Sequence, residues 1–115
     1  MFGCEVYVAT NVNGIPYLST KGMSVTEDAV NVSLGFRAIP KIGKLAIRFT
    51  TAIPEGTTGT LPVRFTLNGN TRELTFFGGD PVTVADLTGT GVIESWYDWF
   101  NGIFQLTSAL APATA

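Results

Sequence analysis

Acidic side chains are the first candidates for chemistry, because the chain contains no histidine. Histidine is the side chain used most often for general acid–base catalysis and at many metal sites. Among the nine acidic residues, Glu94 and Asp98 share one face of an expected strand, where the rise per residue separates them by about 13 Å. Glycoside hydrolysis needs carboxylates about 5 to 9.5 Å apart. The spacing therefore predicts no catalytic carboxylate pair.

Two further acids and one thiol complete the candidates for metal or nucleophile chemistry. Asp80 and Asp86 lie in "GGDPVTVADLTGTG", but they do not follow the D-x-[DN]-x-[DN]-G spacing of a calcium loop. Capping of turns is the better interpretation of both residues. Cys4 is the only cysteine and has no histidine to activate it. We therefore expect no catalytic residue, no metal ligand and no cofactor, and so not an enzyme.

Two tryptophans near the end of the chain, Trp96 and Trp99, leave a binding function open. Exposed aromatic rings stack on sugars, so the pair is a candidate carbohydrate platform. The alternative interpretation places Trp99 in the core and Trp96 in a protein interface.

Charge and hydropathy narrow the possible partners. Charged residues make up 14% of the chain and apolar residues 45%, against a usual charged share of about 25%. A surface so poor in charge tolerates being covered by a partner better than it tolerates bulk water. The seven basic residues are scattered and form no basic stripe interleaved with aromatics, which argues against nucleic acid. No apolar run approaches the ~18 residues of a membrane helix, and "MFGC" lacks the flanks of a lipoprotein signal.

Alternating segments dominate the elements that must position these residues. Residues 29–36 place Val30, Val32, Leu34 and Phe36 on one face, and residues 44–50 alternate in the same way, so both are predicted strands. Residues 4–12 run into Asn13-Gly14, a strong hairpin signal, which pairs Val12 with Ile15 and Thr10 with Tyr17.

Residues 61–77 predict another hairpin with two possible registers. A turn at Asn68-Gly69 places Phe65 opposite Arg72, whereas a turn at Gly69-Asn70 places Phe65 opposite Leu74 and Val63 opposite Phe76. Because burial specifies register, the second register, which gathers the large apolar groups, is favoured.

The segment "ESWYDWFNGIFQL", residues 94–106, fits either an amphipathic helix or a hairpin by periodicity. Its aromatic and β-branched residues favour a sheet, and Asn101-Gly102 lies where a helix would need its interior. As a hairpin turning there, it pairs Trp99 with Phe104 and Tyr97 with Leu106.

Together these segments predict an all-β fold, an antiparallel β-sandwich of about eight to ten short strands with hairpin turns at Asn-Gly sites. One domain spans residues 1–107, with at most a short helical turn near residues 84–88. The expected core comprises Phe36, Ile47, Phe49, Phe65, Leu74, Tyr97 and Trp99. Residues 108–115 are expected to form an extended C-terminal arm, because Pro112 precludes a regular helix and Leu110 is the only large apolar side chain there.

The order of "AIPEGTTGTLPV", "GDPVTVADL" and the closing Tyr97-Asp98…Gly102-x-Phe104-Gln105-Leu106 resembles small β-sandwich virion proteins of tailed bacteriophages. The likeness covers residues 25–107 and is greatest to auxiliary capsid (decoration) proteins and related modules of crAss-like phages of gut bacteria. The resemblance implies a non-enzymatic structural protein of the virion, made in the host cytoplasm.

The partners that this resemblance implies are other virion proteins, either the major capsid protein or neighbouring copies of this chain. Trp96, Leu110 and Pro112 are the candidate interface residues. The alternative is a glycan- or receptor-binding module of a phage tail or fibre. Neither interpretation involves nucleic acid or a membrane.

Overall fold

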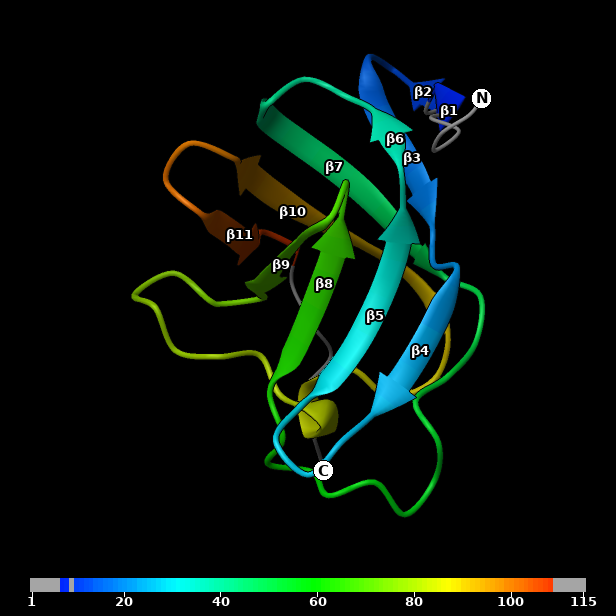
Figure 1. Ribbon diagram of the computed structural model, residues 1–115, viewed down its shortest axis with the longest axis vertical. Helices are drawn as coiled ribbons and strands as arrows, with labels where there is room; N and C mark the ends of the chain where they lie inside the picture. Colours follow the sequence, from blue (N-terminus) through cyan, green and yellow to red (C-terminus); the bar gives the residue numbers. More distant parts are fainter. Residues whose placement is uncertain (1–6, 9, 109–115) are drawn as a thin grey trace.

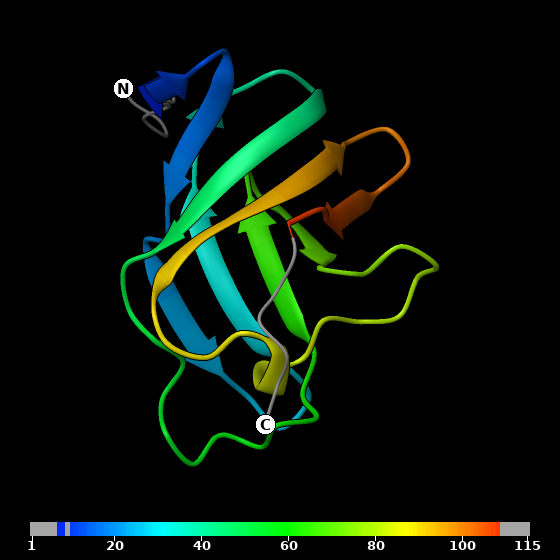
Figure 2. The ribbon, with the colours of Figure 1, turned by 180° about the vertical axis from the view of Figure 1, so that it is seen from behind.

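A computed structural model of the chain describes residues 7, 8 and 10–108. Within this part, eleven strands and one 3-10 turn are present, and two larger sheets pack face to face. Figure 1 shows the two layers, with one sheet in front of the other, and Figure 2 shows them from behind. The predicted β-sandwich is confirmed.

The first layer is a five-stranded sheet in the order β11-β10-β7-β3-β2. Its strands are β2 (Thr10–Val12), β3 (Ile15–Ser19), β7 (Ile42–Phe49), β10 (Gly91–Asp98) and β11 (Ile103–Leu106).

The second layer is a four-stranded sheet in the order β4-β5-β8-β9. It contains β4 (Gly22–Val25), β5 (Val30–Gly35), β8 (Val63–Leu67) and β9 (Asn70–Glu73). A small parallel pair joins β1 (Tyr7–Val8) to β6 (Arg37–Ala38), and the 3-10 turn η1 covers Val84–Asp86. The helical turn expected near residues 84–88 is thus present.

The chain alternates between the two layers, which explains why not every pair of strands is antiparallel. Hairpins give antiparallel neighbours, whereas strands joined through the other sheet pair in either direction. Strands β3 with β7 and β5 with β8 are parallel, and β7 with β10 is antiparallel. On the β9–β11 side the layers join: the Thr75 amide donates to the Phe104 carbonyl (2.9 Å) and the Leu106 amide to the Thr75 carbonyl (2.7 Å). On the other side the chain crosses directly from β3 to β4.

Four aromatic rings connect the layers at the centre. Phe65 of the four-stranded sheet meets Phe49 with ring centroids 5.9 Å apart and Phe104 at 4.9 Å, and Phe104 in turn meets Tyr97 at 5.3 Å. The predicted core residues Ile47, Phe49, Phe65, Leu74 and Tyr97 are all buried. Around them pack Leu18, Val30, Val32, Leu34, Leu45, Val63, Leu67, Val82, Ile93 and Leu106.

The expectation that Phe36 is in the core is wrong, since it is 39% exposed. The register with β8 shifts between Ser33 and Gly35, and Gly35 has a φ of +75°. Glycine adopts this left-handed conformation without steric cost, and the irregularity interrupts the alternation of side chains along the strand. As a result Arg37, rather than Phe36, is buried.

The favoured register of the hairpin at residues 61–77 is also wrong. The turn is Asn68-Gly69, with φ values of +52° and +81°, and Phe65 lies opposite Arg72. Asn68 is held further by its side chain, which accepts a hydrogen bond from the Arg37 amide (2.7 Å) and donates to the Arg37 carbonyl (2.9 Å). Phe65 loses no burial, because its aromatic neighbours lie in the other sheet.

The predicted hairpin at residues 94–106 is present, and the helical alternative is excluded. Its register differs by two residues: Tyr97 pairs with Phe104, and Trp99–Gly102 form the turn. Asp98 stabilises this longer turn by accepting a hydrogen bond from the Asn101 amide (3.1 Å). A shift of two keeps Tyr97 and Phe104 on the inner face, but it moves Trp99 out of the core to 37% exposure. At the first hairpin the predicted pairs are observed, Val12 with Ile15 and Thr10 with Tyr17.

We predict that Phe65→Ala costs about 3–5 kcal/mol of unfolding free energy, because the ring is fully buried between the layers. Phe77→Ala is the matched control, since that ring is 89% exposed, and should change stability by less than about 0.5 kcal/mol. Urea unfolding measures both, and equal losses would contradict the assigned faces.

A second stability prediction concerns Ser95 on the inner face of β10. Its hydroxyl is buried and, among the described residues, makes no hydrogen bond. An unsatisfied buried hydroxyl costs about 1–3 kcal/mol. Ser95→Ala is therefore expected to leave stability unchanged or to raise it, as measured by thermal and urea unfolding. A clear loss of stability would mean that the hydroxyl has a partner in solution.

Candidate interaction surface

The outer face of the five-stranded sheet carries large apolar side chains that are open to solvent. By register, Ile42 of β7, Asp98 of β10 and Ile103 of β11 lie side by side across three strands. Ile42 is 46% exposed and Ile103 39%. Trp96, next along this face of β10 and 43% exposed, lies between Lys44 and Gln105.

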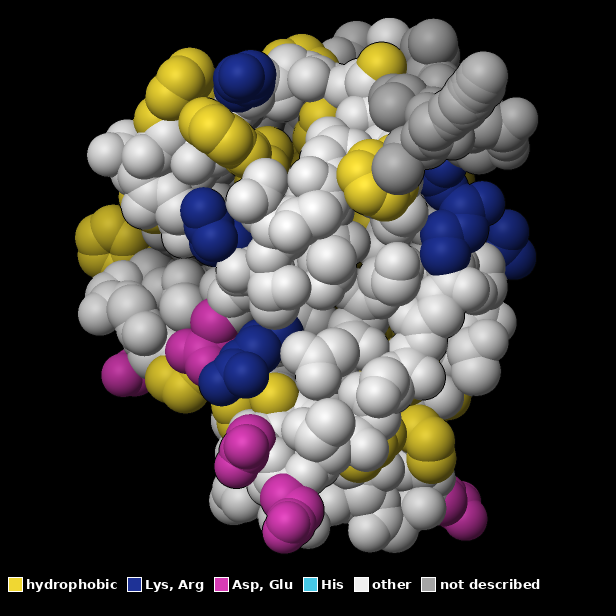
Figure 3. Space-filling view, viewed as in Figure 1, with side chains coloured by type: hydrophobic (Ala, Val, Ile, Leu, Met, Phe, Trp, Pro, Cys, Tyr) yellow, Lys and Arg dark blue, Asp and Glu magenta, His cyan; other side chains and the backbone are white. Residues whose placement is uncertain are grey.

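The β10–β11 turn extends this apolar surface beyond the end of the sheet. Trp99 and Phe100 contact each other edge to face, with centroids 5.6 Å apart, and Phe100 is 64% exposed. The Lys41 ammonium lies 4.5 Å from the Trp99 ring centroid, and the Trp99 amide donates to the Lys41 carbonyl (2.8 Å). These contacts hold the turn against the start of β7. In Figure 3 hydrophobic groups gather beside a basic side chain at this end of the molecule.

We call Ile42, Trp96, Trp99, Phe100 and Ile103 the apolar patch. A cation over an aromatic face contributes about 0.5–1 kcal/mol at an exposed site, so Lys41 orders the rings without burying them. Scattered exposed apolar residues are normal, but contiguous ones mark interaction sites. The patch is therefore the candidate interaction surface of the described part of the chain.

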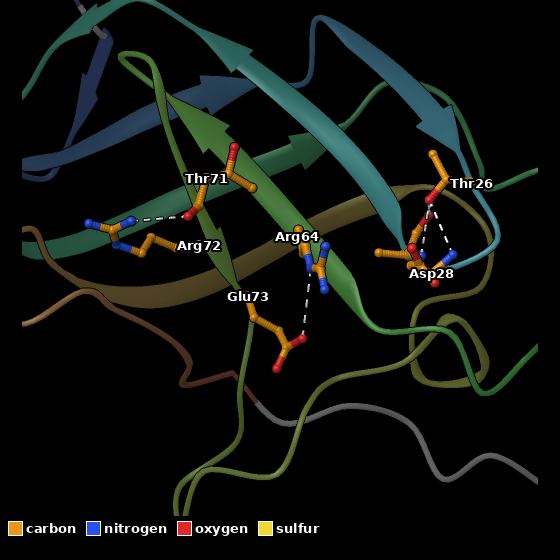
Figure 4. A network of polar contacts seen from close by, with 7 residues as sticks. Thr26, Asp28, Arg64, Thr71, Arg72 and Glu73 are labelled. Atoms are coloured by element: carbon orange, nitrogen blue, oxygen red, sulfur yellow. Dashed lines mark hydrogen bonds and ion pairs between the residues drawn. The ribbon is translucent and has the colours of Figure 1, made fainter.

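The outer face of the four-stranded sheet is different in character. Here Arg64 pairs with Glu73 at 3.9 Å, and the Thr66 and Thr71 hydroxyls are 2.9 Å apart. Figure 4 shows the Arg64–Glu73 pair across β8 and β9, and the neighbouring Arg72, whose guanidinium donates to the Thr71 carbonyl. Small and polar side chains also cover the centre of this face in Figure 3. The two outer faces of the sandwich are thus unlike.

Among the candidate interface residues from the sequence, the structure places only Trp96. It lies at the surface, on the outer face of β10. Leu110 and Pro112 lie outside the described residues, as does all of the predicted arm except Ser108. Ile42, Phe100 and Ile103 were not singled out from the sequence, because their proximity depends on strand register and turn length.

Two of the residues weighed for chemistry, Glu94 and Asp86, are engaged in local structure. Glu94 pairs with Lys44 at 3.2 Å. Asp86 accepts hydrogen bonds from the Thr83 amide (2.9 Å) and hydroxyl (3.0 Å), which is the turn-capping role expected of it. Cys4 lies outside the described residues. In the part of the chain that the structure describes, no three acidic or cysteine side chains gather as a metal site would require.

Two side chains of β10 have perturbed pKa values, Asp98 on its outer face and Tyr97 in the core. Hydrogen bonds from the Asn101 side chain (2.7 Å) and amide hold the pKa of Asp98 below its ordinary value of 3.8, against an opposing effect of burial. Burial raises the pKa of Tyr97 above 10.0, and the nearby Arg72 charge partly offsets the rise. Asp98 is thus an anion that braces the turn.

Comparison of the chain with protein-family models, with curated proteins and with solved structures finds no match. Among the helices of the described residues, none is long and apolar enough to cross a bilayer.

We predict that Asp98 stabilises the fold in a pH-dependent way. The pKa of Asp98 is lower in the folded chain than its ordinary value. The free energy of folding that the ionised carboxylate contributes is therefore fully present above the pKa of the unfolded chain. It is lost as the pH falls through the pKa of the folded chain. Asp98→Asn should therefore be destabilising at pH 7, and its difference from the wild-type chain should shrink at about pH 2.

Urea unfolding at both pH values measures the effect. The control is Asp80→Asn, which removes an exposed loop carboxylate and should show little difference at either pH. A gap between Asp98→Asn and wild type that persists at low pH would mean that the carboxylate is not what holds the turn.

Proposed function

We propose that this chain is a non-enzymatic structural protein of a phage virion, most consistent with an auxiliary or decoration protein bound to the capsid. Two kinds of support combine. The turn and strand motifs within residues 25–107 resemble such proteins, and the β-sandwich fold agrees with that resemblance. The partner is the major capsid protein or another copy of this chain, and the site of action is the virion.

The observation that carries the proposal is the apolar patch on one side of the sandwich. Five large apolar side chains there are each between 37% and 64% exposed, whereas the opposite sheet presents threonines and an ion pair. A monomer in water gains nothing from keeping such a surface exposed. A protein partner that covers it removes apolar area from water, worth about 25 cal/mol for each Å² buried.

The composition of the patch fits a protein partner. Aromatic residues are enriched in the centres of interfaces, and charged residues are depleted there. Trp96, Trp99 and Phe100 supply the aromatics, and Lys41 lies at the margin. Lys44 and Glu94 border Trp96 as an ion pair at 3.2 Å, and the Asp98 carboxylate between Ile42 and Ile103 is hydrogen-bonded to Asn101.

A glycan- or receptor-binding module of a tail or fibre is the second candidate, supported by the exposed rings of Trp96 and Trp99. Sugar stacking requires an open ring face. The Lys41 ammonium lies 4.5 Å from the Trp99 ring centroid and Phe100 contacts that ring edge to face, so Trp99 is less open to a sugar than Trp96. This arrangement favours the protein partner.

The proposal predicts that placing charge in the patch weakens binding to the particle without unfolding the chain. The test variant carries Ile42→Lys and Ile103→Lys, which flank Asp98 across the sheet, so the new ammonium groups have a carboxylate nearby. Binding to particles that lack the protein should weaken by about tenfold or more, while the melting temperature changes little. Cosedimentation and calorimetry measure the two effects.

Thr71→Lys on the opposite, polar sheet is the matched control and should bind as the wild type does. Equal binding by all three chains would contradict the assignment of the patch. Binding that is lost only on removal of cell-surface glycans would support the second candidate instead.

A further inference from the structure

Strand β4 is an edge that is open to another strand. Among the described residues it pairs only with β5, and Figure 1 shows it at the margin of the front sheet. Gly22, Ser24 and Val25 are exposed, and the strand contains neither a charge nor a proline. Natural sheets usually protect edges with lysine, proline or a bulge. The opposite edge strand, β9, carries Arg72 and Glu73.

The hydrogen-bonding groups of β4 that face outward can be identified. The Thr26 amide donates to the Ala29 carbonyl (2.9 Å), and the Val30 amide donates to the Pro62 carbonyl (3.0 Å), away from β4. Antiparallel pairs alternate between bonded and non-bonded, so Gly22 and Ser24 bond to β5. The backbone amides and carbonyls of Met23 and Val25 therefore point to solvent and offer a template for an added strand.

A hollow of about 230 Å³ lies beside this edge, lined by β4, Thr20, Lys21 and the segment from Thr50 to Pro54. It is smaller than the roughly 300–1,000 Å³ of small-ligand pockets and suits a single aliphatic side chain. Met23, Ala52 and Pro54 give it apolar walls. The hydroxyls of Thr20 and Thr50 bond to each other at 3.0 Å, so they do not require a polar ligand.

We propose that residues 109–115 of a second copy of this chain add to β4 as a strand, with the Leu110 side chain in the hollow. The inference rests on the proposed function for its setting, since strand exchange between copies is a means of building a shell layer. The segment "ALAPATA" has no charge and a single large apolar side chain. The arm brings no side-chain charge to a strand, Gly22–Val25, whose own side chains carry none.

The proline of this arm fits the same geometry. Residues in an added strand alternate in the direction of their amides. If Ala109, Ala111 and Ala113 donate toward β4, Pro112, which has no amide hydrogen, faces away from the ladder, where a proline is tolerated. Leu110 and Pro112 then share the face that meets the hollow, and the small alanine side chains allow close approach.

The arm must come from another copy, because the chain's own Leu110 cannot reach. Ser108 is bound to β10: its amide donates to the Glu94 carbonyl (3.2 Å), and its hydroxyl accepts from the Glu94 amide (3.1 Å). From there β4 lies in the other layer, which packs about 10 Å away, at the edge of that sheet farthest from β9. Two residues of extended chain span at most about 7 Å.

The test is the oligomeric state of the purified full chain, measured by light scattering over a range of concentrations. Wild type should associate. Val25→Lys, which places a charge on the β4 edge, and Leu110→Asp should each weaken association by about tenfold or more. Deletion of residues 109–115 should have the same effect. Val12→Lys, at a valine of the β2 edge that is 50% exposed, is the matched control and should leave association unchanged.

A wild-type chain that stays monomeric up to about 1 mM would overturn the proposal, as would association that survives Val25→Lys. Association that is weakened by Val25→Lys but not by Leu110→Asp or by the deletion would mean that two β4 edges pair directly. That result would also overturn the proposal that the arm binds β4. Leu110→Asp changes a residue beyond the predicted domain of residues 1–107, so it remains informative if Val25→Lys impairs folding. Because these measurements involve no particle, they are independent of whether the proposed virion function holds.

Discussion

The contact of Phe65 with Phe49 and Phe104 is the interaction on which the rest of the structure depends. It is the point at which the two sheets bury their apolar faces against each other, and the ring of Phe65 is fully buried there. A chain with one cysteine and no metal-binding cluster among its described residues relies on this burial for its stability. The other large buried apolar side chains of both sheets belong to the same core cluster as these rings.

Much of the fold could be predicted from alternation and turn chemistry, because both are local. Alternation identified β5, β7 and the inner position of Phe65, and Asn-Gly signals located the first hairpin. The errors have a common physical origin. Phe65 is buried by side chains of the opposite sheet and not by its cross-strand neighbour. Pairing apolar residues within the hairpin therefore predicted the wrong register. Likewise, a left-handed Gly35 turned Phe36 outward, which no periodicity reveals.

The candidate surface could be predicted only in part, for the same reason. Trp96 was a candidate interface residue because of its residue type, and its position on the outer face of β10 leaves it accessible to a partner. Ile42 and Ile103 are distant in sequence and meet only across Asp98 in the assembled sheet. Trp99 was assigned to the core because the turn was expected to be two residues shorter. Which side chains meet at the surface thus depends on how distant strands pair, whereas most of the buried residues can be predicted from the local sequence pattern.

A sandwich with one polar outer face, one apolar patch and one uncharged open edge suits a protein that is surrounded by partners. The central claim, that these partners are those of a virion shell, is tested most directly by counting copies of the chain in purified phage particles by quantitative mass spectrometry. Decoration of the shell predicts hundreds of copies per particle, in a constant ratio to the major capsid protein. Absence from particles would contradict the claim, and tens of copies or fewer would indicate a tail or fibre module.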